Sequence, residues 1–259
     1  MAQPVPIDVV YGLVGTGYSR AHNVLANGIE YVAKGPSWVR QFRHLAANEL
    51  VAAGLAVFMG LPMPDFRILS QAKKLFFGSV QLAPSEYHPA IDDYFFDLCE
   101  NKDVAYELVV FDAWICNKDR HSDNLWVRCS GDSARTKRCT ATTHSLLLID
   151  HDGGLLPDDR EASFFSNCLI GTRINEYVHL PQLKKEIVDP TRLGQAISVA
   201  ESVSDGSIEV IVRSVPDQWL PPSDHDSWIA FLIERRNGLR KIFNDDRAFF
   251  AWLRKTGAI

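Results

Sequence analysis

Polar side chains that could carry out chemistry interrupt the apolar sequence at two places near the middle of the chain. Residues 109–116 (VVFDAWIC) read as the end of a buried helix, and NKDRHSDN follows immediately before the apolar residues LWV. Asp119 and Asn124 lie five residues apart in this loop, and Asp150 ends the strand-like run LLLI. A carboxylate can accept a proton from a hydroxyl group, and Mg²⁺ prefers oxygen ligands of the kind that Asn124 and Asp150 supply. The pattern therefore indicates a cleft that joins proton transfer to a magnesium site.

The first fifty residues contain a second set of candidates. Lys34 ends the strand-like run IEYVAK, and Glu49 follows fifteen residues later on a helix face that otherwise contains alanine and leucine. A glycine-containing loop, Gly15-Thr16-Gly17, precedes them. Transfer of a phosphoryl group from ATP requires a loop of backbone N–H groups over the phosphates, a lysine held by a glutamate, a base and metal ligands. The chain contains these parts in the order that such transfer uses.

Each of these features alone also fits an ordinary structural role. The glycines could form a plain turn, Lys34 could extend along apolar surface with its amine in water, and Glu49 could be a surface charge of the helix. Asp119 and Asn124 could cap a solvated loop. The conjunction favours chemistry, because the loop follows a buried helix and precedes two strands, of which the second ends in Asp.

The elements expected around these residues form two parts. The first part is β-rich, with a hairpin over residues 22–34 that turns at Asn27-Gly28 and a helix over 42–59. The later part is mainly helical, with two strands at 124–129 and 144–150 and a polar insertion between them. We expect an N-terminal lobe at 1–75, a connector at 76–90 and a helical C-terminal lobe at 91–259. This organisation defines the α+β class.

Several of these segments resemble one known family. NKDRHSDNLWV followed by LLLIDHDGG is similar to the N-x-D-R-H-x-x-N loop and Asp-ending strand of the HipA-like serine/threonine kinases. IEYVAKG and NELVAAGLAVFMGLPMP resemble the ATP-lysine strand and the following helix of that family, and VPDQWLPP (215–222) resembles a late segment of some members. The resemblance implies a two-lobed, protein-kinase-like fold that uses ATP and Mg²⁺ to phosphorylate serine or threonine.

The resemblance also implies roles for individual residues. Asp119 is then the catalytic base, with His121 beside it as an orienting or catalytic group. Asn124 and Asp150 are the magnesium ligands. Lys34 contacts the ATP phosphates and Glu49 pairs with it. The phosphate loop contains Gly15, Thr16, Gly17 and Ser19. The metal segment reads D-H-D-G-G where protein kinases have D-F-G.

Three alternatives use the same residues. Phosphatidylinositol kinases also have a D-R-H-x-x-N loop, so a lipid or small-molecule kinase is possible. However, acidic residues outnumber Arg160 in the segment 152–161 and would repel an anionic head group. Transfer of the nucleotide instead of the γ-phosphate needs the same metal ligands. A nucleotide-binding pseudokinase would keep its function without Asp119.

Composition limits the partners and the location. The formal net charge of −5 argues against general nucleic-acid binding, and the longest apolar run, 50–61, is too short to cross a bilayer. The five cysteines form no C-x-x-C pair, which favours a reducing cytoplasm over a disulfide framework. We expect an unidentified protein substrate, and the family resemblance adds a possible antitoxin or other regulatory protein.

Overall fold

The structure is a computed structural model. It describes residues 3–14, 20–35, 44–83, 87–88, 93–130, 143–151, 154–155 and 180–245. The phosphate loop expected at residues 15–19 and the polar insertion expected between the two C-terminal strands fall largely or wholly outside the described residues.

The N-terminal part is a curled six-stranded sheet with the order β1-β5-β6-β4-β3-β2 among the described residues. Residues 5–13 close it, because their first part pairs with β5 in parallel and their second part pairs with β3. The backbone N–H of Ile7 donates to Ser70 O and that of Asp8 donates to Leu25 O, both at 2.8 Å. The strands are β1 Val5–Pro6, β2 Val9–Leu13, β3 His22–Ala26, β4 Ile29–Lys34, β5 Phe66–Gln71 and β6 Lys74–Val80.

The hairpin between β3 and β4 places Lys34 at the end of its strand. Asn27 and Gly28 join the two strands with φ angles of 51° and 74°. Positive φ at both central residues is what a type I′ turn requires, so the expected turn is confirmed. β4 also pairs with β6, and Lys34 lies opposite Phe77 in that register. β4 is therefore an interior strand of the sheet, with β3 on one side and β6 on the other, and Lys34 ends it.

Helix α1, Leu45–Phe58, is almost completely buried. Its sequence, LAANELVAAGLAVF, is rich in alanine and leucine, the strongest helix formers. Gly60, two residues after the end of the helix, has a φ of 70°. Its N–H donates to Val57 O and the N–H of Leu61 donates to Ala56 O, which is the Schellman arrangement of a helix C-terminus. This helix carries Glu49 into the interior of the molecule.

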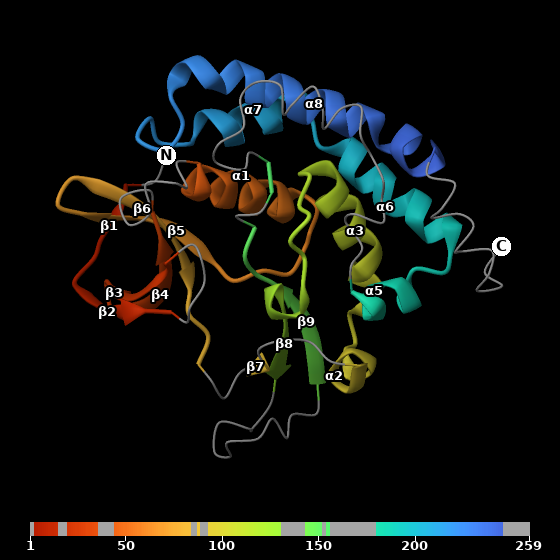
Figure 1. Cartoon of the computed structure of the whole chain (residues 1–259), viewed down its shortest axis with the longest axis horizontal. Helices are drawn as coiled ribbons and strands as arrows, with labels where there is room; N and C mark the ends of the chain where they lie inside the picture. Colours follow the sequence, from red (N-terminus) through yellow and green to blue (C-terminus); the bar gives the residue numbers. More distant parts are fainter. Residues whose placement is uncertain are drawn as a thin grey trace.

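The rest of the chain is mainly helical, as expected. A three-stranded sheet with the order β7-β8-β9 lies beneath the helices in the part that the structure describes (Figure 1). The strands are β7 Tyr87–His88, β8 Leu125–Ser130 and β9 Thr143–Leu148. The helices are α2 Asp93–Leu98, α3 Ala105–Trp114, α5 Pro181–Glu186, α6 Pro190–Ser202, α7 Asp205–Arg213 and α8 Pro222–Asp245, with short 3-10 turns at Lys102–Val104 and Ser122–Asn124.

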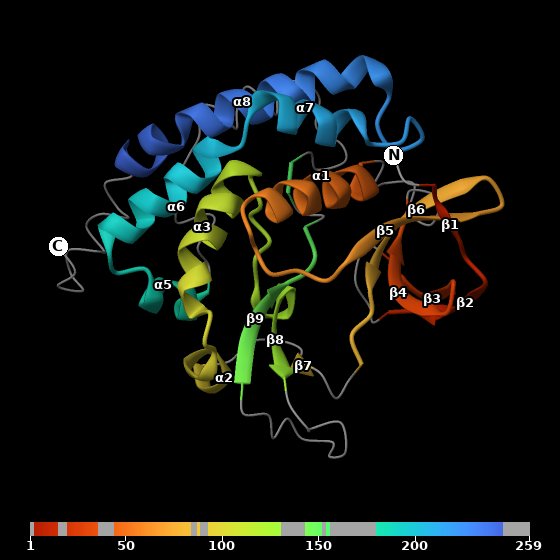
Figure 2. The ribbon, with the colours of Figure 1, turned by 180° about the vertical axis from the view of Figure 1, so that it is seen from behind.

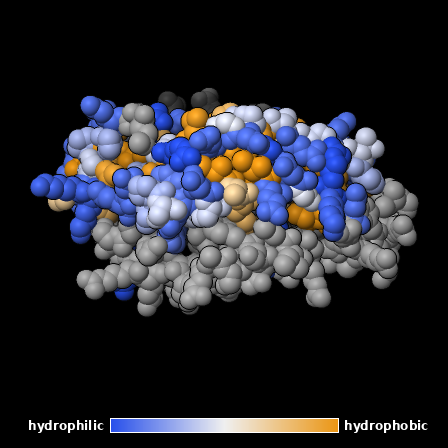
Figure 3. Space-filling view, turned by 90° about the horizontal axis from the view of Figure 1, so that it is seen from above, coloured by the Kyte–Doolittle hydropathy of each residue, from blue (hydrophilic) through white to orange (hydrophobic). Residues whose placement is uncertain are grey.

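Helix α1 lies between the curled sheet and the C-terminal helices, and the view from behind shows the same order (Figures 1 and 2). One hydrophobic core runs from α1 through α3 to α8, while a smaller cluster around Val24, Tyr31 and Phe76 fills the curled sheet. Seen from above, where α7 and α8 lie, the described surface is mainly hydrophilic around a central apolar patch (Figure 3). The α+β fold with a small β-rich part and a larger helical part is confirmed.

None of the described helices is long and apolar enough to cross a membrane.

The described cysteines are in two states. Cys129 in β8 is disulfide-bonded, which the cysteine spacing did not predict, whereas Cys99 and Cys116 are free and buried. Burial raises the pKa of the Cys99 thiol to about 12, which favours its protonated form at neutral pH.

Candidate active site

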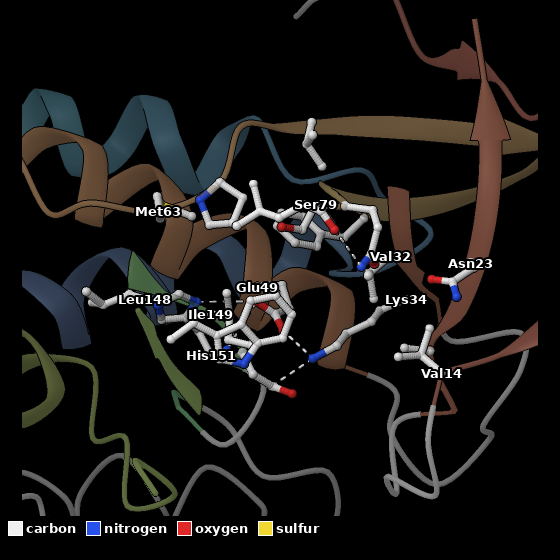
Figure 4. A pocket seen from close by; sticks show the side chains of 18 of the residues that line it. Val14, Asn23, Val32, Lys34, Glu49, Met63, Ser79, Leu148, Ile149 and His151 are labelled. Carbon is white, nitrogen blue, oxygen red and sulfur yellow. Dashed lines mark hydrogen bonds and ion pairs between the residues drawn. The ribbon is translucent and has the colours of Figure 1, made fainter. Parts of the chain in front are cut away.

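Lys34 lies between two carboxylates that come from distant parts of the chain. Its Nζ is 2.6 Å from Oε1 of Glu49 on α1 and 2.7 Å from Oδ1 of Asp150 after β9. Figure 4 shows the lysine side chain extended toward Glu49, with both ion pairs as dashed lines. The three residues that the sequence placed on separate elements are therefore in direct contact. The excess negative charge at this point suits a cationic group.

Glu49 is held in its ionised form although it is buried. Burial alone would raise the pKa of this carboxyl group. The Lys34 ammonium and a hydrogen bond from His151 lower it more, and the net result is a pKa below the ordinary value. Glu49 is therefore a fixed anion at neutral pH, able to hold the lysine in one position.

His151 connects the glutamate to the segment that bears Asp150. Its backbone N–H donates to Oε2 of Glu49 at 3.2 Å, and its ring Nδ1 lies 3.5 Å from the same oxygen. The ring packs edge-on against Phe111, with centroids 5.7 Å apart. The preceding residue, Asp150, has a φ of 55°, an uncommon conformation for a residue other than glycine and one often found at functional sites. This turn brings the Asp150 carboxylate to Lys34 while His151 contacts Glu49.

The loop after α3 presents Asp119 to solvent on a rigid backbone. The Asn117 side chain donates to Asp112 and accepts from the backbone N–H of Asp119. The amide nitrogen of Asn124 donates to Asp119 O at 2.9 Å. The side chain of Asp119 remains 61% exposed, so the loop orders its backbone and leaves the carboxylate open to a substrate.

His121 lies next to Asp119 in this loop. Its Nε2 is 3.9 Å from Oδ2 of Asp119, and its Nδ1 accepts from the backbone N–H of Asp123 at 3.2 Å. The imidazole is about half exposed. The structure therefore places His121 beside Asp119, and both of these ring contacts lie within the loop 117–124.

A buried ion pair fastens this loop to the segment that bears Asp150. The Arg120 guanidinium donates to both carboxylate oxygens of Asp112, at 3.1 and 3.0 Å, and neither side chain is exposed. The same guanidinium donates to Asn124 O at 2.9 Å and to Ile149 O at 2.8 Å. Bidentate pairs of this kind are strong and directional. Arg120 therefore sets the position of the loop relative to the strand end at Asp150.

The sequence pattern did not single out three residues with buried contacts at the site, Asp112, Arg120 and His151. A signal for the first was present, because Asp112 is the only charged residue between 108 and 117 in a run that is otherwise apolar. A charge there needs a buried partner, and Arg120 is the first cation of the polar loop that is itself buried. Nothing in the spacing indicated that His151 would face Glu49.

A cavity of about 440 Å³ opens beside the Lys34 ion pairs. Its walls come from both parts of the fold: the strands of the curled sheet on one side and β7, β8 and the end of β9 on the other. Tyr87 and Trp126 stack within it, with ring centroids 4.1 Å apart and an angle of 4°. The cavity is thus apolar and aromatic over part of its wall and charged at Lys34, Glu49 and Asp150.

Asn124 and Asp150 are chemically suited to a hard cation. The Asn124 amide nitrogen is bonded to Asp119 O, so its oxygen is the group that a cation would use. The described residues contain no group of three or more His, Cys, Asp or Glu side chains that could hold a metal. Mg²⁺ typically uses one or two protein oxygen ligands together with phosphate oxygens and water. The residues present therefore fit magnesium delivered with a nucleotide.

The fold and the site together define a protein-kinase-like protein, with a lysine–glutamate pair beside an Asp–Asn loop and a strand-ending Asp. The chain belongs to the HipA-like kinase family, whose sequence profile matches residues 17–249. This match confirms the resemblance that the sequence motifs indicated.

Two solved structures have the same fold. One is the proinflammatory kinase CtkA of Helicobacter pylori, at 12% identity and a TM-score of 0.59, with 96% of this chain and 98% of that chain covered. The other is a chain of the Shewanella oneidensis MR-1 toxin–antitoxin complex of HipA, HipB and operator DNA, at 12% identity and a TM-score of 0.53, with 92% and 67% covered. No significant match is found among curated protein sequences.

Proposed function

We propose that this kinase transfers the γ-phosphoryl group of ATP, with Mg²⁺, to a serine or threonine hydroxyl of a protein. The observation that carries the proposal is the contact of Lys34 with both Glu49 and Asp150 at the wall of the cavity. In protein kinases the lysine–glutamate pair and the metal-binding aspartate must both be in place for transfer. The choice of serine or threonine rests on the family resemblance.

The chain's own residues supply binding, orientation and proton transfer. The stacked Tyr87–Trp126 pair offers a flat apolar surface for a purine ring, and Lys34 would orient the phosphates. Asp119 would take the proton of the acceptor hydroxyl while the new O–P bond forms and the bond to the ADP oxygen breaks. Asn124 and Asp150 would hold Mg²⁺, which neutralises charge on the phosphates when it is bound. Gly15, Thr16, Gly17 and Ser19 remain the proposed phosphate loop.

A regulatory protein partner is a further part of the proposal. The similar Shewanella oneidensis structure is a complex of HipA with HipB and operator DNA. By analogy, a protein that controls the kinase would bind this chain, while the net charge of −5 gives no reason to expect direct nucleic-acid binding.

A paired labelling assay tests the function directly. Purified protein, Mg²⁺ and a cell lysate are incubated with ATP labelled at the γ or the α position, and Asp150→Asn serves as the inactive control. We expect protein labelling from the γ position only, and its loss in Asp150→Asn, because the amide cannot supply the anionic ligand. Label from the α position would instead establish nucleotidyl transfer, and no label from either would exclude a protein kinase.

Substitution of Lys34 by methionine should lower kcat/KM for ATP by about 10²–10³-fold, the size of effect found when one donor that stabilises transition-state charge is removed. Methionine preserves the length of the side chain but leaves the carboxylates of Glu49 and Asp150 without their shared cation. Steady-state kinetics with varied ATP would check this. An unchanged kcat/KM for ATP would remove Lys34 from the site.

A further inference from the structure

The segment between α7 and α8 contacts the tip of the β5–β6 hairpin in the distant N-terminal sheet. The Gln218 side chain accepts from the backbone N–H of Leu75 at 3.2 Å and donates to Lys73 O at 3.0 Å. The indole N–H of Trp219 donates to Leu75 O at 3.1 Å. Both backbone groups of Leu75 are therefore bonded to side chains that follow them by more than 140 residues. These residues belong to the VPDQWLPP segment, for which the proposed function gives no role.

Leu75 lies on the strand that supports the lysine. β6 begins at Lys74, and Phe77, two residues after Leu75, pairs with Lys34 in the β4–β6 register. Phe77 and Ser79 on the same strand also line the cavity. A bond that fixes Leu75 therefore fixes the strand on which the position of Lys34 depends.

The same region of the chain also contacts the helix that carries Glu49. Gly54 of α1 faces Ile211 of α7 so closely that an added Cβ would lie 2.9 Å from the Ile211 Cγ2. At the start of α1, the ring of His44 lies 6.0 Å from the ring of Trp228 in α8. Helix α1 therefore packs against α7 at Gly54, and the residue before its first turn contacts α8. Figure 1 shows α1 below α7 and α8.

We propose that residues 211–228, which we call the brace, position the Lys34–Glu49 pair by holding β6 through Gln218 and Trp219 and α1 through Ile211. The two halves of the pair lie on different elements, and the brace is in contact with both of them. This inference rests on the proposed function, since it concerns the site that would bind the ATP phosphates.

The Gln218→Met variant tests the contact to β6. Methionine keeps the size of the side chain and removes both hydrogen bonds, and Gln218 is exposed, so the fold should persist. Asp217→Asn, at the exposed neighbouring position, is the matched control. We expect hydrogen exchange at the Leu75 amide to accelerate and kcat for γ-phosphoryl transfer to fall about tenfold, since small displacements of catalytic groups have effects of this order or larger.

A pair of substitutions, one that enlarges Gly54 and one that truncates Ile211, tests the contact between α1 and α7. Alanine normally stabilises a helix relative to glycine. Gly54→Ala should therefore lower activity only if the added methyl group collides with Ile211 and displaces α1. We expect Gly54→Ala to lower kcat about tenfold by displacing α1. Ile211→Ala in the same chain removes the obstructing atoms and should restore most of the rate. A rate that is unchanged in Gly54→Ala, or not restored in the double variant, would contradict the contact's role.

Binding of Mg²⁺ with a non-hydrolysable ATP analogue, measured by calorimetry on each variant, separates this inference from the proposed function. If the wild-type protein binds the analogue but transfers no label, the proposed function fails. The test of the brace is then whether Gln218→Met and Gly54→Ala bind the analogue more weakly than the wild-type protein does. Faster Leu75 exchange in Gln218→Met with unchanged transfer and binding would overturn the brace. Unchanged Leu75 exchange would also overturn it, because the contact would then be absent in solution.

Discussion

Replacement of Asp119 by alanine should lower phosphoryl transfer by about 10²–10⁴-fold, the range attributed to general acid–base catalysis, and leave the protein folded. The backbone of Asp119 makes the contacts that order the loop, since its N–H donates to Asn117 and its carbonyl accepts from Asn124. The Asp119 side chain is 61% exposed, and its Oδ2 lies 3.9 Å from Nε2 of His121. Alanine removes the proton acceptor and preserves the backbone bonds.

The matched control is Asp123→Ala, which removes a second carboxylate from the same loop. The Asp123 side chain is 74% exposed, and its backbone N–H, which bonds to His121, is unaffected by the change. Both variants lose one negative charge, so a difference between their transfer rates shows the effect of losing the carboxylate at position 119 in particular. The measurement is the initial rate of γ-label transfer at saturating ATP, with thermal unfolding as a check on the fold.

The effect of Asp119→Ala on transfer distinguishes an enzyme from a protein that only binds nucleotide. A large loss of transfer in Asp119→Ala with little change in Asp123→Ala would support the proton acceptor. Full transfer by purified Asp119→Ala would refute that role. If the protein acted as a nucleotide-binding component alone, binding and any cellular effect would survive the substitution.

The contact of Lys34 with Glu49 could be expected from sequence because each residue is placed by local structure. A type I′ turn at Asn27-Gly28 sets the register of β4, which ends at Lys34. An alanine-rich helix with a glycine stop carries Glu49 on a buried face. Turn chemistry and helix propensity placed each residue on its element, and the family resemblance implied that the two residues pair.

The contacts of Arg120 and of Gln218 could not be predicted in the same way. Arg120 bonds to Ile149, and Gln218 bonds to Leu75, across large separations in the chain. Neither hydrophobic periodicity nor turn residues predict these hydrogen-bond partners, because the contacts depend on how helices, strands and loops pack against one another in the folded protein. The late segment VPDQWLPP could be noticed as a family resemblance, yet its hydrogen bonds to the β5–β6 hairpin required the structure.

The second large effect is expected at the buried pair of Asp112 and Arg120, in the stability of the protein. Asp112→Ala would leave the Arg120 guanidinium without a counter-charge in a site where neither side chain is exposed. Breaking a buried pair on one side costs about 3–5 kcal/mol, a large share of the stability of an ordinary domain. Urea unfolding should show a lower midpoint, and the loop from 117 to 124 should lose order first.

A double variant separates this loss of stability from the positioning of the loop. Apolar residues of similar volume often replace a buried ion pair at little or no cost, so Asp112→Leu with Arg120→Met should recover most of the free energy of unfolding. Transfer should remain low in this variant, because methionine cannot donate to Asn124 O and Ile149 O as Arg120 does. If the double variant recovered both stability and transfer, the pair would serve packing alone. If Asp112→Ala cost less than about 1 kcal/mol, well below the range for a broken buried pair, the pair would not be what holds the loop.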